Sequence, residues 1–205
     1  MITNKKGLDL IKEFEGLELL AYQDIAGVWT IGYGHTSPDV KPDDAITAKQ
    51  AEELLIRDIL VREKKLTGWC EHWGISPNEN EYSATISFIY NLGFGSFKGS
   101  TFARRWRKGN KLGGADSMKW WNKATVDGTL RPIVGLTRRR NAEAALFLTP
   151  VSKSSNAPTK SNYTLEEDSR ITNGVVIETK PKTSVTRFNL WGLIVGIITK
   201  NLRNR

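Results

Sequence analysis

Two carboxylates and a hydroxyl follow one another near the start of the chain, at Glu15, Asp24 and Thr30. Cleavage of a glycosidic bond needs an acid that protonates the leaving oxygen and a carboxylate that attacks the sugar or activates water. A neighbouring hydroxyl can hold that water in line. Acid pairs with this spacing are also common on solvated surfaces, so the spacing alone favours a surface pair over a catalytic one.

The residues around the two acids predict a helix that leads into a small sheet. Apolar residues recur at helical spacing before Glu15, at Leu8, Leu10, Ile11 and Phe14. We expect a helix that is capped by Thr3 or Asn4 and ends at Glu15. The negative end of its dipole favours the protonated form that a general acid needs. The β-branched and aromatic residues that follow are separated by glycines, which predicts a turn-rich sheet that brings Asp24 back towards the helix end.

Several later segments predict helices. Thr47 and Gln50 form a capping box at the start of an amphipathic helix of about four or five turns, which can join a sheet-containing lobe to a helical lobe. Asn78 or Asn80 caps a strongly apolar helix that we expect the other helices to surround. Further helices are expected at about residues 100–108, 111–121 and 136–148. A turn closed by Pro77 is expected to contain Trp69, His72 and Trp73.

The acid pattern and three later segments resemble the phage-type lysozymes, or endolysins, of glycoside hydrolase family 24. Glu15, Asp24 and Thr30, followed by IleGlyTyrGlyHis, are similar to the catalytic signature of that family. The later segments are ISFIYNLGFGSF at 86–97, KWWNKA at 119–124 and GLTRRRNAEAALF at 135–147. The resemblance covers about residues 4–149, with the four patterns in the family's order, and does not extend to residues 151–205.

The resemblance implies an α+β, lysozyme-like two-lobed fold, in which a long helix joins a small N-terminal β-sheet lobe to a larger helical lobe. The implied activity is hydrolysis of the β-1,4 bond between N-acetylmuramic acid and N-acetylglucosamine in peptidoglycan, for lysis of a bacterial host. The family's members resemble inverting enzymes, which activate water rather than form a covalent intermediate. No cofactor or metal is implied, and the two histidines and one cysteine have no metal-binding spacing.

The resemblance also implies roles for individual residues. Glu15 matches the proton donor, Asp24 the second acid and Thr30 the residue that helps to place water. Thr36 and Phe97 align with positions that line the family's sugar cleft.

Several residues near these patterns have structural interpretations. His35 is expected to be a hydrogen-bonded or ion-paired brace. Arg138–Arg140 are typical of a solvated helix face. In the resembled family, however, an arginine of the last helix can approach the catalytic glutamate, and Arg139 and Arg140 match the paired positions. Trp120 and Trp121 are expected to pack in the core rather than to stack on sugars.

The net charge of +8 lies largely in the C-terminal part of the chain. Residues 151–205 hold nine Lys or Arg and four Asp or Glu, a net +5, which leaves +3 for residues 1–150. Such an excess favours nucleic acid, anionic lipid or an acidic polysaccharide wall as partner. No nucleic-acid-binding motif accompanies it, so we expect no nucleic acid partner. We expect a monomer, and the single cysteine, Cys70, excludes an intramolecular disulfide.

The two ends of the chain give expectations about location. The N-terminal stretch alternates charged and apolar residues, without the continuous apolar core of a secretory signal. We therefore expect the protein to accumulate in the host bacterial cytoplasm and to reach the cell wall, in the periplasm, through a membrane pore.

Residues 1–150 are expected to form the catalytic domain, 151–187 a flexible linker with a short strand at 175–177, and 188–205 an apolar and basic C-terminal segment. As a helix, the apolar run Phe188–Ile198 reaches only about 16 Å, too short to span a membrane. The segment Phe188–Arg205 either lies on an anionic membrane surface or docks on the catalytic domain or on another subunit.

Two other functions stay open at this point. A lytic transglycosylase cuts the same bond with one acid and leaves a 1,6-anhydro sugar, so it has no need of Asp24 or Thr30. A non-catalytic wall-binding or virion structural module has no need of Glu15. The presence of all three groups favours hydrolysis.

Overall fold

The computed structural model describes residues 1–24 and 26–151. The predicted linker at 151–187, except for Val151, and the predicted C-terminal segment at 188–205 lie outside the described residues. The described elements are α1 (Lys5–Glu15), β1 (Glu18–Gln23), β2 (Trp29–Gly32), β3 (His35–Thr36), α2 (Ala48–His72), α3 (Glu79–Gly99), α4 (Thr101–Trp106), α5 (Lys111–Met118), β4 (Lys123–Val126), β5 (Thr129–Pro132) and α6 (Val134–Leu148). None of the described helices is long and apolar enough to cross a membrane.

Helix α1 ends at the first of the two acids. Its N-cap is Asn4, whose side chain accepts a hydrogen bond from the backbone N–H of Gly7. The helix stops at Glu15 because Gly16 has φ 73°, a left-handed conformation that suits glycine. An added Cβ at Gly7 would lie 2.6 Å from Cβ of Ser83, so α1 packs closely on α3 at this point. The predicted helix from Asn4 to Glu15 is confirmed.

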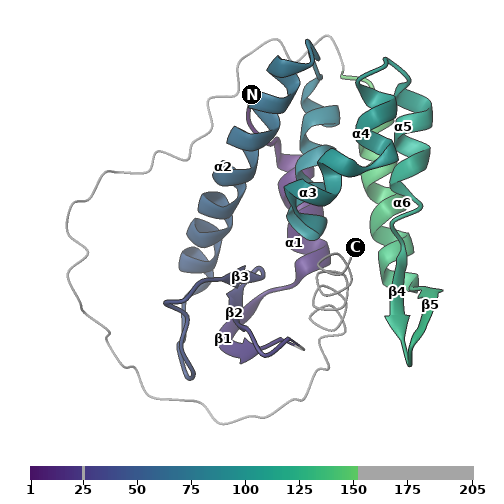
Figure 1. Ribbon diagram of the computed structural model, residues 1–205. Helices are drawn as coiled ribbons and strands as arrows, with labels where there is room; N and C mark the ends of the chain where they lie inside the picture. The colour runs from purple at the N-terminus through teal and green to yellow at the C-terminus, as the bar shows by residue number, and fades with distance from the viewer. Residues whose placement is uncertain (25, 152–205) are drawn as a thin grey trace. The chain divides into compact units, whose positions relative to one another are not determined.

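The predicted small sheet is also confirmed. Strands β1, β2 and β3 are antiparallel and lie in sequence order. Thr30 on β2 pairs with Tyr22 on β1 and with Thr36 on β3, so these three residues form one row across the sheet. In Figure 1 the sheet lies at one end of α2. Helices α1 and α3 lie between α2 on one side and α4, α5 and α6 on the other (Figure 1).

Helix α2 begins with the predicted capping box of Thr47 and Gln50 but is longer than expected. It has 25 residues, which is about seven turns. The prediction of a turn at Trp69, His72 and Trp73 was wrong for the first two, because α2 continues to His72. Trp69 and Cys70 are buried in the core, and this packing supports the two additional turns.

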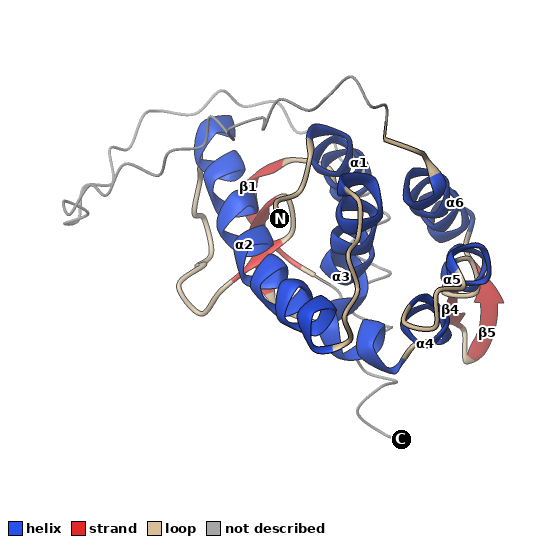
Figure 2. Ribbon diagram, turned by 90° about the horizontal axis from the view of Figure 1, so that it is seen from above, coloured by secondary structure: helices blue, strands red, loops and turns tan. Residues whose placement is uncertain are grey.

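Helix α3 is the central element of the core. It contacts α1, α2, α4 and α6, as expected from its apolar sequence, and Figure 2 shows α1 and α3 between α2 and α6. Its N-cap is Asn78, which forms a capping box with Glu81. The backbone at Gly93, with φ 81° and ψ 155°, is not helical, so α3 consists of two helical segments that meet at a kink, and the second segment ends at Gly99.

The last third of the described chain contains a hairpin that the sequence did not predict as such. Strands β4 and β5 are antiparallel and join at Asp127 and Gly128, with φ 49° and 73°. Two consecutive positive φ values are typical of a type I′ hairpin turn. The helix predicted at 111–121 ends earlier, at Met118, and leads into this hairpin. Together, six helices and two small antiparallel sheets in the described residues confirm the predicted α+β class.

Candidate active site

Glu15 lies at the C-terminal end of α1 with one side against a buried arginine and the other against a glycine turn. Its side chain is 10% exposed, and Arg139 Nη1 donates to Glu15 Oε1 at 2.7 Å. A Cβ added at Gly34, which has φ 83°, would lie 3.4 Å from Glu15 Oε2. Gly34 therefore gives Oε2 room as well as closing the turn. Glu15 thus contacts a buried cation in addition to lying at the C-terminal end of a helix.

Arg139 is itself held by a buried network on α6 and α3. Its Nε lies 3.1 Å from Glu143 Oε1, and its Nη2 donates to the backbone oxygen of Ser87. The Ser87 hydroxyl donates to the same Glu143 oxygen at 2.8 Å. Burial lowers the pKa of Arg139, but the Glu15 and Glu143 carboxylates outweigh burial, and the pKa is raised overall. The guanidinium stays charged and fixes the position of Glu15.

Arg140 completes this network beneath Arg139. Its Nε is 3.2 Å from Glu143 Oε2, and its Nη2 donates to Asn91 Oδ1 at 2.6 Å. Burial lowers the pKa of Arg140 to about 10, although Glu143 opposes that shift. Both Arg139 and Arg140 are fully buried, so the expectation of a solvated face was wrong for them and right only for Arg138, which is 71% exposed.

Asp24 lies on the turn between β1 and β2 and is partly exposed. Its Oδ1 accepts hydrogen bonds from the backbone N–H groups of Ala26 and Val28, both at 2.8 Å. These bonds form an Asx-type turn that fixes the carboxylate without a cation. Among the described residues, Oδ2 has no hydrogen-bond partner.

Thr30 on β2 and Tyr22 on β1 are paired residues of the sheet. Thr30 is buried, and its hydroxyl donates to the backbone oxygen of Val28 at 3.1 Å, which leaves its lone pairs able to accept. Burial raises the pKa of Tyr22 to about 12, with further contributions from the negative charges of Glu18, Glu15 and Asp24. The Tyr22 hydroxyl therefore stays protonated at neutral pH, and both acids contribute to this. Sequence reasoning missed Tyr22, although its two-residue spacing from Asp24 was visible.

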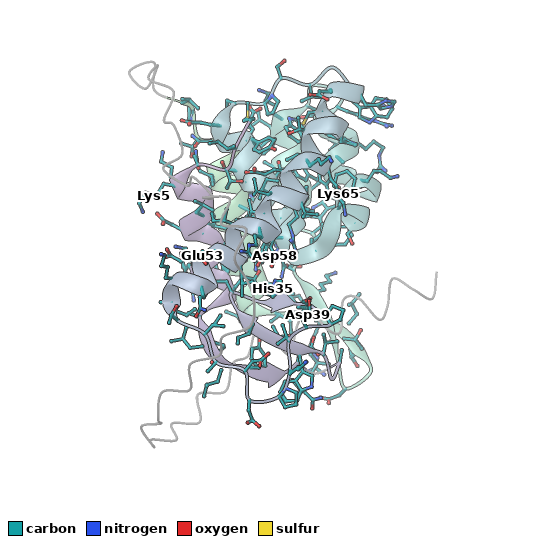
Figure 3. All side chains as sticks on the ribbon, turned by 90° about the vertical axis from the view of Figure 1, so that its left-hand side faces the viewer. Lys5, His35, Asp39, Glu53, Asp58 and Lys65 are labelled. Atoms are coloured by element: carbon teal, nitrogen blue, oxygen red, sulfur yellow. The ribbon has the colours of Figure 1, made fainter. Side chains whose placement is uncertain are left out.

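His35 forms the predicted brace. Its Nδ1 lies 3.0 Å from Asp58 Oδ2 on α2, and the two residues lie side by side in Figure 3. Arg62 Nη1 is 3.8 Å from the other Asp58 oxygen, and its guanidinium lies 4.3 Å from the ring centroid of Tyr90. These contacts attach β3 to α2.

Tyr90 is a second residue that sequence reasoning missed. Its hydroxyl donates to the backbone oxygen of Tyr33 at 2.9 Å, which ties α3 to the turn before β3. Burial raises the pKa of Tyr90, and the negative charge of Glu15 contributes to the rise. Tyr90 lies within the resembled segment 86–97, and this was the signal available in the sequence.

The two predicted sugar-contacting residues differ in position. Thr36 lies exposed on β3, beside Thr30. The prediction for Phe97 was wrong, because its side chain is 0% exposed and its ring packs on Trp69, 4.9 Å between centroids, and on Phe102. A fully buried ring has no surface with which to contact a sugar.

The two tryptophans of the KWWNKA segment also differ. Trp121 packs against the core at Phe88, as expected. Trp120 is 54% exposed, contrary to expectation, and the Arg105 guanidinium lies 4.9 Å from its ring.

No metal site accompanies these groups within residues 1–24 and 26–151, where no three His, Cys, Asp or Glu side chains gather. The site therefore contains a carboxyl beside a buried cation, a carboxylate fixed by backbone N–H groups, and a buried hydroxyl on the sheet. General acid catalysis paired with activation of water needs groups of these kinds.

Comparisons with known proteins agree with this chemistry. The sequence model of the family described as phage lysozyme matches residues 12–143. The chain is 40% identical over 147 residues to the endolysin of Acyrthosiphon pisum secondary endosymbiont phage 1, covering 72% of this chain and 98% of that protein.

Two solved structures are also similar to this chain in sequence and in fold. The endolysin from Escherichia coli O157:H7 phage FAHEc1 is 44% identical with a TM-score of 0.63, over 72% of this chain and 94% of that one. The muramidase domain of SpmX from Asticaccaulis excentricus is 35% identical with a TM-score of 0.67, over 72% and 97%.

Proposed function

The chain belongs to the phage lysozyme family, and we propose that Glu15 and Asp24 are the two acids with which it cleaves its substrate. The protein is a glycoside hydrolase that hydrolyses peptidoglycan for lysis of the host bacterium. The bond cleaved is the β-1,4 bond between N-acetylmuramic acid and N-acetylglucosamine. The observation that carries the assignment is the contact between Glu15 and the fully buried Arg139.

Glu15 acts as the proton donor. Arg139 occupies Oε1, so the proton that passes to the glycosidic oxygen is carried by Oε2, beside Gly34. Arg139 is a positioning residue in this scheme, since it holds the carboxyl group in one orientation through its own contacts with Glu143 and Ser87. Departure of the sugar then leaves a negative charge on Glu15, which the adjacent guanidinium stabilises.

Asp24 and Thr30 act on the water. The two backbone N–H groups that bind Asp24 Oδ1 orient the carboxylate, and Oδ2 removes a proton from water. The Thr30 hydroxyl donates to Val28, so it is an acceptor for that water and orients it. Attack by water on the face opposite to the leaving group inverts the anomeric configuration, and the proposed outcome is an α product from a β bond. Thr36, on the same row of the sheet, is proposed to contact the sugar.

Asp24→Asn is expected to lower the rate of peptidoglycan clearing by about 10²–10⁴-fold, because an amide does not accept the proton of water. The matched control is Asp39→Asn, an exposed acid of the same lobe, which is expected to clear at the wild-type rate. Proton NMR of the first product released by the wild type checks inversion directly. A β product, or full activity of Asp24→Asn, would contradict the proposed role.

The protein acts on the cell wall. Accumulation in the host cytoplasm before release, a monomeric state, and contact of Phe188–Arg205 with an anionic membrane are further parts of the proposal. The division into a catalytic domain at 1–150, a linker at 151–187 and a C-terminal segment at 188–205 is proposed with them, and it is supported by the end of α6 at Leu148.

A further inference from the structure

A concave surface lies among the helices of the described chain. This groove has a volume of about 1090 Å³ and runs between the C-terminal half of α2 and the corner where α3 meets α4. None of Glu15, Asp24 and Thr30 lines it. It begins within about one turn of Asp58, and Figure 3 shows Lys65, one of its lining residues, further along α2 from Asp58.

The groove is strongly basic. Its lining contains no Asp or Glu, and it contains six basic residues, Lys64, Lys65, His72, Lys98, Arg104 and Arg107. All six are exposed, and no carboxylate within residues 1–24 and 26–151 forms an ion pair with any of the five Lys and Arg side chains.

The concentration of charge is larger than the composition implies. Residues 1–150 contain 21 Lys and Arg and 18 Asp and Glu, a net charge of +3, whereas the groove lining contains five Lys and Arg and no Asp or Glu. The groove is therefore lined by charges of one sign, and a hollow of this kind attracts ligands of the opposite sign.

Aromatic side chains lie among these cations. Trp73 is 43% exposed, and the Arg107 guanidinium lies 4.4 Å from its ring centroid. The His72 ring meets Trp73 edge to face at 4.9 Å. Phe94 lines the groove from α3 and is partly exposed. The groove thus presents apolar ring surface next to cationic donors, which suits a ligand that alternates carbon-rich units with anionic groups.

We propose that this groove binds a phosphate-bearing polymer of the bacterial envelope, a chain of polyol or sugar units joined by phosphodiesters. Phosphate oxygens would meet the Lys and Arg side chains, and the polyol or sugar units would lie against Trp73 and Phe94. A hollow between helices accommodates a linear chain, whereas a membrane surface is contacted by an outward-facing patch. Binding there holds the enzyme at the wall without occupying the Glu15 site.

The test uses the full-length protein and labelled poly(glycerol phosphate), with affinity measured by fluorescence anisotropy at several salt concentrations. The groove variant is Lys65→Gln with Arg104→Gln and Arg107→Gln. It is expected to bind at least about tenfold more weakly. In a plot of log K against log salt concentration, the slope for the variant is expected to be less negative than that of the wild type by about two. This is the change expected for the loss of three phosphate contacts on a flexible polyanion.

The matched control removes the same charge elsewhere, by Lys6→Gln with Lys41→Gln and Lys119→Gln, all exposed and outside the groove. It is expected to bind within about twofold of the wild type. Trp73→Ala is expected to weaken binding without changing the salt dependence, because it removes a ring and no charge. Equal weakening by the groove and control variants would overturn the proposal, since net charge would then explain binding.

Two further measurements separate the alternatives. The groove variant is expected to hydrolyse polymer-free peptidoglycan at the wild-type rate, so failure of the proposed acid pair and failure of the groove give different results. Loss of that hydrolysis would make the groove part of the substrate cleft and overturn the proposal. The groove variant is also tested for binding to phosphatidylglycerol vesicles. If it kept its affinity for poly(glycerol phosphate) but lost binding to the vesicles, the groove would be a lipid site and the proposal would be overturned.

Discussion

Glu15→Gln is expected to lower the rate of peptidoglycan hydrolysis by about 10²–10⁴-fold and to leave the fold intact. The amide oxygen can still accept the hydrogen bond from Arg139 Nη1, so the buried network keeps its geometry. The amide has no acidic proton to give to the leaving oxygen, so only the chemistry is lost. Loss of turbidity of purified peptidoglycan measures the rate, and circular dichroism confirms the fold.

The chain offers a closely matched control in Glu13→Gln. Glu13 is on the same helix, two residues earlier, but its side chain is 63% exposed. Its ion pair with the exposed Arg138, at 3.7 Å, lies on the surface. We expect Glu13→Gln to clear peptidoglycan at the wild-type rate, because a surface pair contributes little. Comparable activity of Glu15→Gln and Glu13→Gln, with both folded, would rule out Glu15 as the proton donor.

Glu143→Gln is expected to destabilise the protein by about 3–5 kcal/mol, the effect of removing one partner from a buried ion pair. Glu143 is fully buried and is the carboxylate that contacts both Arg139 and Arg140, at 3.1 and 3.2 Å. Without its charge, Arg140 has no carboxylate contact among the described residues, and Arg139 keeps only Glu15. Urea denaturation followed by tryptophan fluorescence gives the change in the free energy of unfolding.

Activity provides a second readout for this variant. Because Arg139 is less firmly held, we expect slower hydrolysis even at temperatures where Glu143→Gln is fully folded. Arg138→Gln is the control on the same helix, at an exposed position, and is expected to change stability by less than about 0.5 kcal/mol. A loss below about 1 kcal/mol for Glu143→Gln would show that the network is not a major source of stability.

Local signals in the sequence accounted for the helix starts. Asn4, Thr47 and Asn78 cap α1, α2 and α3, because a side-chain oxygen next to a helical pattern satisfies free backbone N–H groups regardless of the remaining fold. Glu15 at the end of α1 followed from the same reasoning, since Gly16 stops the helix there.

Features that depend on tertiary contacts could not be predicted from local sequence signals. The last two turns of α2 contain Gly68 and Trp69, which are weak helix formers, and they are helical because Trp69 packs on Phe97 and Trp106. Phe97 follows the kink at Gly93, and its helical conformation and its buried position were not predicted from the glycine-rich sequence around it.

Part of the candidate site could likewise be predicted from local sequence, and part depends on tertiary contacts. The acids and Thr30 lie close together in sequence, so a short helix and a small sheet were enough to predict them. The burial of Arg139 and Arg140 depends on Glu143, whose spacing of four and three residues was a local signal that the RRRNAE pattern offered. The contacts of Arg139 with Glu15 and Ser87 join residues 124 and 52 positions apart and needed the structure.

The most direct test of the account is mass spectrometry of the products formed from peptidoglycan in ¹⁸O-labelled water. Hydrolysis by water that Asp24 activates predicts one labelled oxygen at each new reducing N-acetylmuramic acid end. Products that end in unlabelled 1,6-anhydro-N-acetylmuramic acid would contradict it, because the reaction would then proceed without water.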